Sequence, residues 1–487
     1  MLKLQTNVFK FGGSCFKTEQ SFNQSLKIVE KYHNEPLAIV CSALYGVTDK
    51  LIEYGNSVVN PGDIEDAPDI FLSEIKDKHM KFIDTLIQDD DLHKEMETFI
   101  QEKIDDLMDL RNHIEQEGLT PENHDYLVSF GERISGFLYT EYLKSEGFQA
   151  QFIPSDEDFL ITDSNFGNAL PKLNVCKKNI IKKLNPNLEE KKISIIPGFY
   201  GKNKKGQVTT LGRGGSDFTA TIVGWALSEE DNFVNCIFWK DVNGILTVDP
   251  QYVKNPKLLK KISIKEAKEL TFFGTKILHP KCLNTAEKGG DHIKIEIRNF
   301  NDPFSEEFTT ITKKAFHPDR SDKIIKAITT LNDIAMITVQ SDAMVDLPGT
   351  AAKIFSIIAE YNINIIFITQ GSSENNISFG VYAQDGLKAK KLLEKNKYFG
   401  SNWFKVKIEM EAALLSVVGA QMVHKPGVAG LLFTTLGNAG INIRAISQGS
   451  SEMNITMVIS RDSLERAIKV CYSSFIEGNL PTKIAKW

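Results

Sequence analysis

The chain has 487 residues, which is too long for one hydrophobic core, so two to four domains are expected. Hydrophobic residues make up 42% of the chain, charged residues 25%, and the formal net charge is −6. These values fit a globular protein and exclude the basic surface that nucleic-acid binding requires. No apolar run is long enough to span a membrane, and the six cysteines are scattered without a Cys-x-x-Cys pair. We therefore expect a cytoplasmic protein that binds neither nucleic acid nor membrane.

The first predicted element is a short strand, Val8-Phe9, which runs into the glycine turn Lys10-Phe-Gly-Gly-Ser14. Glycine lets backbone N–H groups approach an anion, because no Cβ atom stands in the way. A Gly-Gly pair alone is typical of an ordinary tight turn. The lysine beside this one favours a phosphate site.

A second buried strand, Leu37–Cys41, runs into the loop Ser42-Ala-Leu-Tyr-Gly-Val-Thr48. Residues 68–117 then carry two amphipathic stripes, which predict a helical hairpin inserted into an α/β domain. The acidic triplet Asp89-Asp-Asp91 lies between the two stripes. Three carboxylates there could hold a metal ion, but they are more typical of the N-terminal cap of a helix.

Further strands are predicted at residues 193–196, 234–239 and 293–297, with helices such as 219–227 and 264–270 between them. This alternation favours a largely parallel sheet covered by helices, in which ligands gather at the carboxyl ends of the strands. A second glycine turn, Thr209-Thr-Leu-Gly-Arg-Gly-Gly-Ser-Asp217, follows such a strand. Its arginine and aspartate suit the binding of phosphate and carboxylate groups.

Lys313–Lys323 is polar, contains a proline and is predicted to be a linker. Beyond it the chain repeats itself at a constant offset of 78 residues. Pro348-Gly349 matches Pro426-Gly427, Asn364 matches Asn442, and Gln370-Gly-Ser-Ser-Glu374 matches Gln448-Gly-Ser-Ser-Glu452. Each repeat is interpreted as strand, Pro-Gly turn, helix, strand, strand, helix. We expect the two repeats to pair side by side, and duplication for stability alone is the alternative.

Together these segments resemble the aspartate kinases of the amino-acid kinase superfamily. The opening Lys10-Phe-Gly-Gly-Ser14 matches the family's Lys-Phe-Gly-Gly motif, with serine where threonine is usual. The other matching segments are Ser42-Ala…Gly46-Val-Thr48, Gly131-Glu132, Thr210-Leu-Gly-Arg-Gly-Gly-Ser-Asp217, Asp241-Val-Asn-Gly-Ile…Asp249-Pro250 and Phe273-Gly-Thr-Lys276-Ile-Leu-His-Pro280.

The resemblance implies an α/β catalytic domain over residues 1–312, with the helical insertion at about 64–124, and a linker over 313–324. Two ACT domains, ferredoxin-like with the order βαββαβ, would follow at 325–400 and 401–487. It also implies transfer of the ATP γ-phosphoryl group to the β-carboxylate of L-aspartate, giving 4-phospho-L-aspartate. This reaction opens lysine, threonine and methionine biosynthesis. ATP is then a substrate, and Mg²⁺ is expected on its phosphates.

The same resemblance assigns roles to residues. Lys10 and Asp217 would be catalytic, with Lys10 at the transferring phosphoryl group and Asp217 orienting it. The aspartate-binding set is Ser42, Thr48, Glu132, Arg213, Gly214, Gly215 and Ser216. The nucleotide-binding set is Lys10, Phe11, Gly12, Gly13, Lys240, Asp241, Leu246, Gln251, Lys276 and Ile277. Local sequence also leaves plainer interpretations open: Asp217 as the cap of a helix over 218–227, and Glu132 as a surface helix residue.

Three nucleotide positions depart from the family pattern. Lys240 stands where threonine is common, Leu246 where tyrosine is frequent, and Gln251 where arginine often follows Asp-Pro. Lys240 could replace the charge that is missing at Gln251. Nucleotide affinity or base preference is expected to differ accordingly.

The expected effector-binding residues of the ACT domains are Gly349, Asn364, Gln370, Asn442 and Gln448. The two glutamine motifs resemble the kinase portion of threonine-responsive aspartokinase/homoserine dehydrogenases, and a buried amide such as Gln370 could bind an amino acid. Ile366 stands where lysine-sensing relatives carry an aspartate, so threonine is favoured over lysine as effector. By analogy we expect a homodimer or homotetramer formed through the ACT domains.

Two other functions stay open. One is an enzyme of the same superfamily that acts on another acid, such as glutamate or a nucleoside monophosphate. The other is a non-catalytic amino-acid sensor that keeps the fold. The charged set Lys10, Arg213, Asp217 and Lys276 argues against a sensor, whereas the departures at the nucleotide positions keep this alternative open.

Overall fold

The computed structural model describes residues 4–60, 67–272, 278–313, 323–344, 347–371, 375–400 and 403–479. The chain divides into two compact units. The first contains residues 1–245, 260–264 and 276–316, and the second contains 246–259, 265–275 and 317–487. None of the helices within the described ranges has both the length and the apolar character needed to cross a bilayer.

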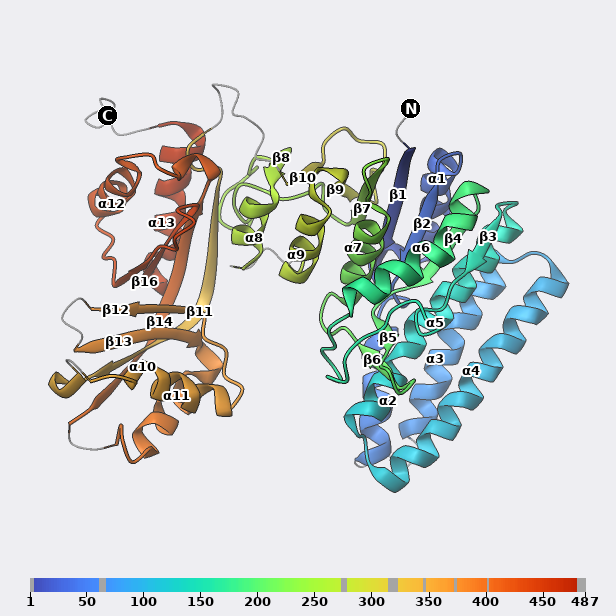
Figure 1. The fold of residues 1–487 in the computed structure, drawn as a ribbon, viewed down its shortest axis with the longest axis horizontal. Coiled ribbons are helices and arrows are strands. Elements are labelled where there is room, and N and C mark those ends of the chain that lie inside the picture. Colours follow the sequence, from blue (N-terminus) through green and yellow to red (C-terminus); the bar gives the residue numbers. More distant parts are fainter. Residues whose placement is uncertain are drawn as a thin grey trace. The chain divides into compact units, whose positions relative to one another are not determined.

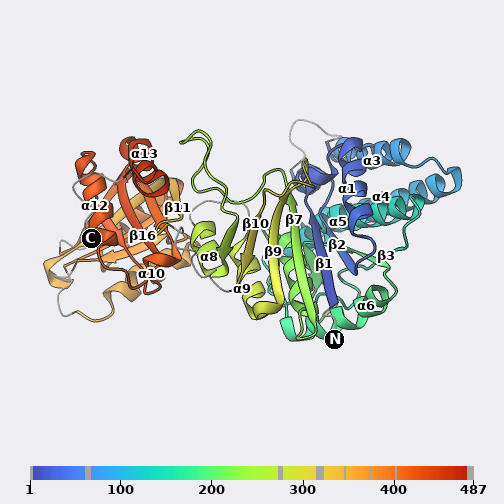
Figure 2. The same ribbon diagram turned by 90° about the horizontal axis from the view of Figure 1, so that it is seen from above.

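The first unit is built on an eight-stranded sheet with the order β3-β4-β2-β1-β7-β9-β10-β8 (Figure 1). Its strands are β1 (Leu4–Phe11), β2 (Leu37–Cys41), β3 (Ala150–Phe152), β4 (Ile193–Pro197), β7 (Asn232–Lys240), β8 (Lys261–Ser263), β9 (Ile293–Asn299) and β10 (Thr309–Thr312). All neighbours pair in parallel except β9 and β10, so the expected mostly parallel sheet is confirmed. Figure 2 shows β2, β1, β7 and β9 side by side at its centre.

Helices cover both faces of this sheet, because its strands are apolar on both sides. One face packs against α1 (Glu19–Tyr32) and α5 (Pro121–Ser145) in a core that includes Phe9, Phe11 and Ile39. The other face carries α6 (Leu173–Glu189), α7 (Gly215–Leu227) and α9 (Pro280–Lys288). Among them, α7 packs directly on β1 and β7.

The predicted helical hairpin is present as α3 (Ala67–Leu86) and α4 (Asp90–Glu117), which pack with α2 (Val47–Val59) and α5 (Figure 1). Asp89 caps α4, since its side chain accepts a hydrogen bond from the backbone N–H of Leu92 at 2.8 Å. Of the two interpretations of the acidic triplet, helix capping is therefore the one observed.

A short hairpin outside the main sheet was not expected from the sequence. It consists of β5 (Tyr200–Lys202) and β6 (Val208–Thr210), which pair only with each other in the sheet order. The second glycine turn leaves β6 of this hairpin and enters α7. The strand expected upstream of this turn is present as β4, and the hairpin lies between β4 and the turn.

The second unit contains a six-stranded antiparallel sheet with the order β12-β13-β11-β14-β16-β15. Its first repeat is β11 (Ala327–Gln340), α10 (Thr350–Glu360), β12 (Phe367–Gln370), β13 (Asn376–Tyr382) and α11 (Ala383–Lys395). Its second repeat is β14 (Lys405–Val418), α12 (Val428–Asn438), β15 (Ala445–Ser447), β16 (Asn454–Ser460) and α13 (Leu464–Cys471). Helix α8 (Ile264–Phe272) also belongs to this unit, apart from its first residue.

The repeat is confirmed in three dimensions. The two copies of the first strand, the first helix and the next two strands each begin 78 residues apart. The copies pair side by side through β11 and β14, as expected. The closing strand of the first copy is the first half of β14, which follows α11 and pairs antiparallel with the second half of β11, so the order β12-β13-β11-β14 fits the expected βαββαβ unit. In the second copy, the described residues after α13 form no strand.

Candidate active site

A cavity of about 370 Å³ in the first unit holds most of the predicted substrate and catalytic residues. Its lining consists of Lys10, Ser42, Thr48, His124, Glu132, Gly167, Phe199, Thr210, Gly212, Arg213, Gly214, Gly215, Ser216 and Asp217. The lysine of the first glycine turn and the arginine of the second thus meet in one cavity. Its polar walls and cationic groups suit a small anionic ligand.

Strand alternation aims Lys10 into this cavity. Phe9 and Phe11 point into the core beneath α1 and α5, so the residue between them must point to the face that α7 covers. Lys10 is only 7% exposed there, and its ammonium contacts Asp217 at 2.7 Å. Gly12 leaves room for this ammonium, because a Cβ atom at that position would lie 3.1 Å from Lys10 Nζ.

Asp217 joins two lysines. It lies in the first turn of α7, and its Oδ1 pairs with Lys10 while its Oδ2 accepts a hydrogen bond from Lys240 Nζ at 2.8 Å. Burial alone would raise the pKa of Asp217, but the two ammonium groups lower it to about 2. Burial would likewise lower the pKa of Lys10, yet Asp217 outweighs it and the pKa is raised. Lys10 and Asp217 are therefore both charged at neutral pH.

The interpretation of Asp217 as a helix cap was wrong. The N-cap of α7 is Gly214, whose φ of +74° lies in the left-handed region that favours glycine. The helix starts at Gly215, so Asp217 is already its third residue. Its side chain does not cap the helix and is therefore available to pair with the two lysines.

Glu132 is buried on α5 and only 4% exposed, so its interpretation as a surface residue was wrong. Burial raises the pKa of its carboxyl group to about 8, and the Ala43 backbone amide and nearby Ser216 offset only part of that rise. Its Oε2 atom has no hydrogen-bond partner among the described residues. An unpartnered buried carboxyl oxygen beside a cavity fits a ligand that supplies a cation.

Sequence reasoning missed two residues at this site, one that supports the lining and one that belongs to it. Asp125 on α5 is fully buried, and its carboxylate accepts hydrogen bonds from the N–H groups of Gly167 (2.8 Å) and Thr210 (2.7 Å) and from the Thr210 hydroxyl (2.8 Å). It thereby fixes β6, from which the arginine-bearing turn starts. The neighbouring His124 lines the cavity itself. The partners of Asp125 lie 42 and 85 residues away, and no local pattern reveals such a contact.

The structure brings only some of the predicted nucleotide-binding residues to the cavity. Phe11 is buried in the core rather than in the cavity lining, and Asp241 is exposed just after β7. Leu246 and Gln251 belong to the second unit. Lys276 and Ile277 lie outside the described residues.

The predicted effector residues lie in the second unit. Gln370 is exposed at the end of β12 and Gln448 just after β15, so the expectation of a buried amide at Gln370 was wrong for the single chain. Gly349 is the left-handed N-cap of α10, with a φ of +89°. Asn364 and Asn442 are exposed.

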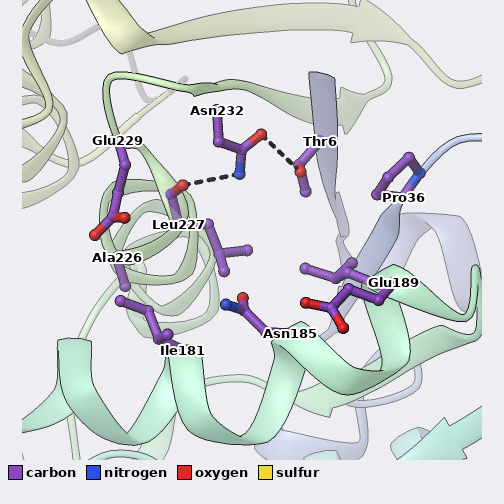
Figure 3. Close-up of a pocket in the computed structure, with 10 residues that line it drawn as sticks. Thr6, Pro36, Ile181, Asn185, Glu189, Ala226, Leu227, Glu229 and Asn232 are labelled. Atoms are coloured by element: carbon purple, nitrogen blue, oxygen red, sulfur yellow. Dashed lines mark hydrogen bonds between the residues drawn. The ribbon is translucent and has the colours of Figure 1, made fainter. Parts of the chain in front are cut away.

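A second cavity lies at the opposite end of the strands, where β1 and β7 begin, between α6 and α7 (Figure 3). Thr6 and Asn232, at the starts of β1 and β7, join there through a hydrogen bond of 3.0 Å. This cavity measures about 180 Å³, and its charged lining residues are Glu189 and Glu229. Since none of its described lining residues is basic, it does not suit two anionic reactants.

A sequence profile of the amino acid kinase family matches residues 5–299, which is more than half of the chain. The chain belongs to the amino acid kinase family. The profile of the ACT domain matches residues 337–396 and 415–475, so this amino acid kinase carries two ACT repeats.

Curated relatives of this amino acid kinase are aspartokinases, alone or fused to a second enzyme. It is 30% identical over 478 residues to bifunctional aspartokinase/homoserine dehydrogenase 2 of Zea mays, covering 96% of the chain but 50% of that relative. The chain thus spans about half the length of the bifunctional relatives. It is also 30% identical to aspartokinase 1 of Arabidopsis thaliana, covering 97% of the chain and 80% of that protein.

Solved structures agree with this family. Aspartokinase III of E. coli, in complex with aspartate and ADP, is 27% identical and superposes with a TM-score of 0.77 over 97% of the chain and 100% of that structure. The aspartate kinase of Clostridium acetobutylicum is also 27% identical, with a TM-score of 0.76 over 96% of the chain and 100% of that structure.

Proposed function

We propose that this amino acid kinase is an aspartate kinase. A β-carboxylate oxygen of L-aspartate attacks the γ-phosphorus of ATP, and the bond from that phosphorus to the β,γ-bridging oxygen breaks. The products are 4-phospho-L-aspartate and ADP. No proton has to move, because the nucleophile is already ionised at neutral pH. The observation that carries the proposal is the single cavity shared by Lys10, Asp217, Glu132 and Arg213.

In this reaction Lys10 faces the transferring phosphoryl group. Phosphoryl transfer depends on positioning and on neutralising charge, since both reactants are anions. A buried ammonium held by Asp217 at 2.7 Å is already oriented before substrate arrives. A sensor without chemistry would gain nothing from burying such a pair, because burying charges is costly.

Aspartate recognition is assigned to other residues of the same cavity. Arg213 can bind the α-carboxylate with its fork of N–H groups, and the unpartnered Oε2 of Glu132 can accept from the α-ammonium. Ser42 and Thr48 add hydroxyl groups, while Gly214, Gly215 and Ser216 form the wall beside Arg213. One cation and one anion in the same cavity favour an amino acid over a nucleoside monophosphate.

In this proposal Mg²⁺ enters the cavity bound to the phosphates of ATP. Among the residues that the structure describes, no group of three or more histidine, cysteine or carboxylate side chains gathers into a metal cage. Asp217 is the carboxylate nearest Lys10, and two ammonium groups already occupy it. When bound, Mg²⁺ neutralises phosphate charge, with phosphate oxygens and water as its ligands.

The nucleotide-binding set is proposed on the resemblance, with Gly12 and Gly13 offering backbone N–H groups and Lys276 facing the phosphates. Asp241, Leu246, Gln251, Phe11 and Ile277 complete the set. The resemblance also places Lys240 in it, but the ion pair of Lys240 with Asp217 favours a different role for this residue.

The decisive experiment measures aspartate-dependent acyl phosphate, trapped as the hydroxamate, together with ADP release. We expect both products with ATP, Mg²⁺ and aspartate, and neither with glutamate or a nucleoside monophosphate. ADP release with glutamate but not aspartate would contradict the proposed substrate. ADP release without any added acid would contradict the proposed class of reaction, which is phosphoryl transfer to a carboxylate.

We also propose that the ACT repeats bind an inhibitory amino acid, with threonine favoured over lysine. Ile366 is 7% exposed and offers no carboxylate for a lysine ammonium. The E. coli relative has been solved in complex with lysine and aspartate, so the binding of a second amino acid besides aspartate has a precedent in that protein. Inhibition by lysine, threonine and methionine, singly and in pairs, tests this. Light scattering tests the proposed homodimer or homotetramer.

A further inference from the structure

Lys240 stands outside the lining of the substrate cavity, yet it is bound to its central carboxylate. Its ammonium lies 2.8 Å from Asp217 Oδ2, while Lys10 lies 2.7 Å from Oδ1. Each oxygen of one buried carboxylate is therefore paired with its own ammonium group. The side chain of Lys240 is 19% exposed and that of Asp217 is 9% exposed, so both ion pairs lie in an environment that water screens poorly.

The geometry of the sheet fixes this arrangement. In the parallel pairing of β1 with β7, Lys10 lies opposite Phe238 and Phe11 lies opposite Trp239. Trp239 shares the core of Phe11, so its neighbour Lys240 points to the opposite face, together with Lys10. The two lysines thus reach the first turn of α7 from adjacent strands, and Asp217 lies between them.

The charges show what the second lysine changes. A lone pair of Lys10 and Asp217 would be neutral, and Lys10 could turn to a phosphate only by leaving Asp217 buried and unpaired. With Lys240 present, the cluster carries one net positive charge. Asp217 then keeps a partner when Lys10 moves. Burial alone would raise the pKa of Asp217, and the value of about 2 reflects both lysines.

We propose that Lys240 is a positioning residue for phosphoryl transfer: it holds Asp217 so that the ammonium of Lys10 is released to the transferring group. This inference rests on the proposed function and deepens it. It also differs from the role that the resemblance gives Lys240, which is direct contact with the nucleotide. The two roles predict opposite kinetic effects.

The test compares Lys240→Met, Lys240→Arg and wild-type protein in steady-state kinetics of ADP release. For Lys240→Met we expect kcat to fall roughly tenfold to hundredfold, near the lower range for losing a preorganised charge at a reacting centre. The KM values for ATP and aspartate should change little, because Lys240 touches neither substrate. Lys240→Arg keeps the charge and should recover most of kcat.

A matched control is Lys103→Met, which removes a lysine–carboxylate pair of 2.5 Å and similar lysine exposure on α4, away from the cavity. This control variant should leave kcat and the KM values unchanged. A double-mutant cycle adds a readout that damage to the fold would not produce: in an Asp217→Asn background, Lys240→Met should have almost no further effect on kcat. If Lys240→Met does not fold by thermal melting, Lys240→Gln takes its place.

An unchanged kcat in Lys240→Met would overturn the inference, and so would a large rise in the KM for ATP with kcat retained. An equal loss of kcat in both backgrounds would overturn it as well. Failure of the proposed function looks different, because the wild-type protein itself would then release no ADP in response to aspartate.

Discussion

Lys10 and Arg213 lie in one cavity but do different work, and kinetics can separate them. In the proposed reaction Lys10 faces the reacting phosphoryl group, so Lys10→Ala should lower kcat by about a hundredfold or more. Arg213 is proposed to bind a part of aspartate that does not react, so Arg213→Ala should mainly raise the KM for aspartate. Steady-state assays at saturating ATP measure both. Normal turnover by the Lys10→Ala protein would refute the assignment.

If Glu132 pairs with the ammonium of aspartate as proposed, aspartate binding should depend on pH. Burial raises the pKa of its carboxyl group to about 8, and only the ionised form can pair with the α-ammonium. Below that pH the carboxyl group must release a proton when aspartate binds. The KM for aspartate should therefore rise up to about tenfold for each pH unit below 8 and level off above it.

Glu132→Gln provides the control for that dependence. The amide cannot ionise, so the KM should be high and flat across the same pH range. Because burying the ionised carboxylate costs stability above its unfolded pKa, this variant should also melt higher than wild type at about pH 9. A pH-dependent KM in the Glu132→Gln protein would assign the effect to another group.

Single residues were predictable from sequence only where local chemistry marks them. Lys10 and Arg213 stand beside glycine turns, so their type and position already favour anion binding. Asp125 carries no such mark, since it lies inside a long helix and its partners come from a distant loop and from β6. The contact of Lys240 with Asp217 spans 23 residues and depends on the register between two strands.

At the scale of helices and strands, the length of an element decided whether its sequence pattern could predict it. Strands such as β2 and β4 are runs of five buried residues, and α3 and α4 carry apolar stripes over many turns, so their patterns predict them. The hairpin of β5 and β6 has only three residues in each strand, which is too short for a distinct alternation. It is held in place partly from outside, through Asp125.

That connection predicts the effect of removing a charge within α5. Asp125→Asn replaces one acceptor oxygen by an N–H donor and leaves at least one of its three hydrogen bonds unmade inside the core. The unfolding free energy should fall by about 2–3 kcal/mol, the cost of an unsatisfied buried polar group. The KM for aspartate should rise as well, because β6 leads into the turn that carries Arg213.

Chemical denaturation and kinetics of the same sample test that expectation. Asp158→Asn is the control, since Asp158 is exposed and its pair with Lys202 contributes little. Equal stability of the Asp125→Asn and Asp158→Asn proteins would show that the three hydrogen bonds do not hold the hairpin.

At the scale of the whole molecule, the repeat was visible in sequence but the division of the chain was not. A constant offset marks two copies of one unit wherever they lie. By contrast, α8 lies inside the range of the amino acid kinase profile yet belongs to the compact unit of the ACT repeats. Its backbone pattern is that of an ordinary amphipathic helix. Only its contacts identify where it packs.

Those contacts join α8 to one of the repeated motifs. Glu269 accepts a hydrogen bond from Ser451 Oγ at 3.2 Å and another from Asn454 Nδ2, and Glu266 accepts one from the backbone N–H of Ala420 at 3.0 Å. Ser451 belongs to the motif Gln448–Glu452, so α8 contacts the segment expected to respond to effector. Along the chain, α8 leads directly into the segment that contains Lys276.

Glu269→Ala should therefore weaken the link between effector and catalysis without touching the chemistry. Since coupling energies are typically 1–3 kcal/mol, the concentration of the inhibitory amino acid needed for half-inhibition should rise about tenfold, with uninhibited kcat retained. Glu465→Ala, which removes an exposed pair with Lys469 on α13, is the control and should leave inhibition unchanged. Binding of the amino acid is measured by calorimetry in parallel. If Glu269→Ala is inhibited as strongly as wild type, the contact with Ser451 and Asn454 is structural and the signal does not pass through α8.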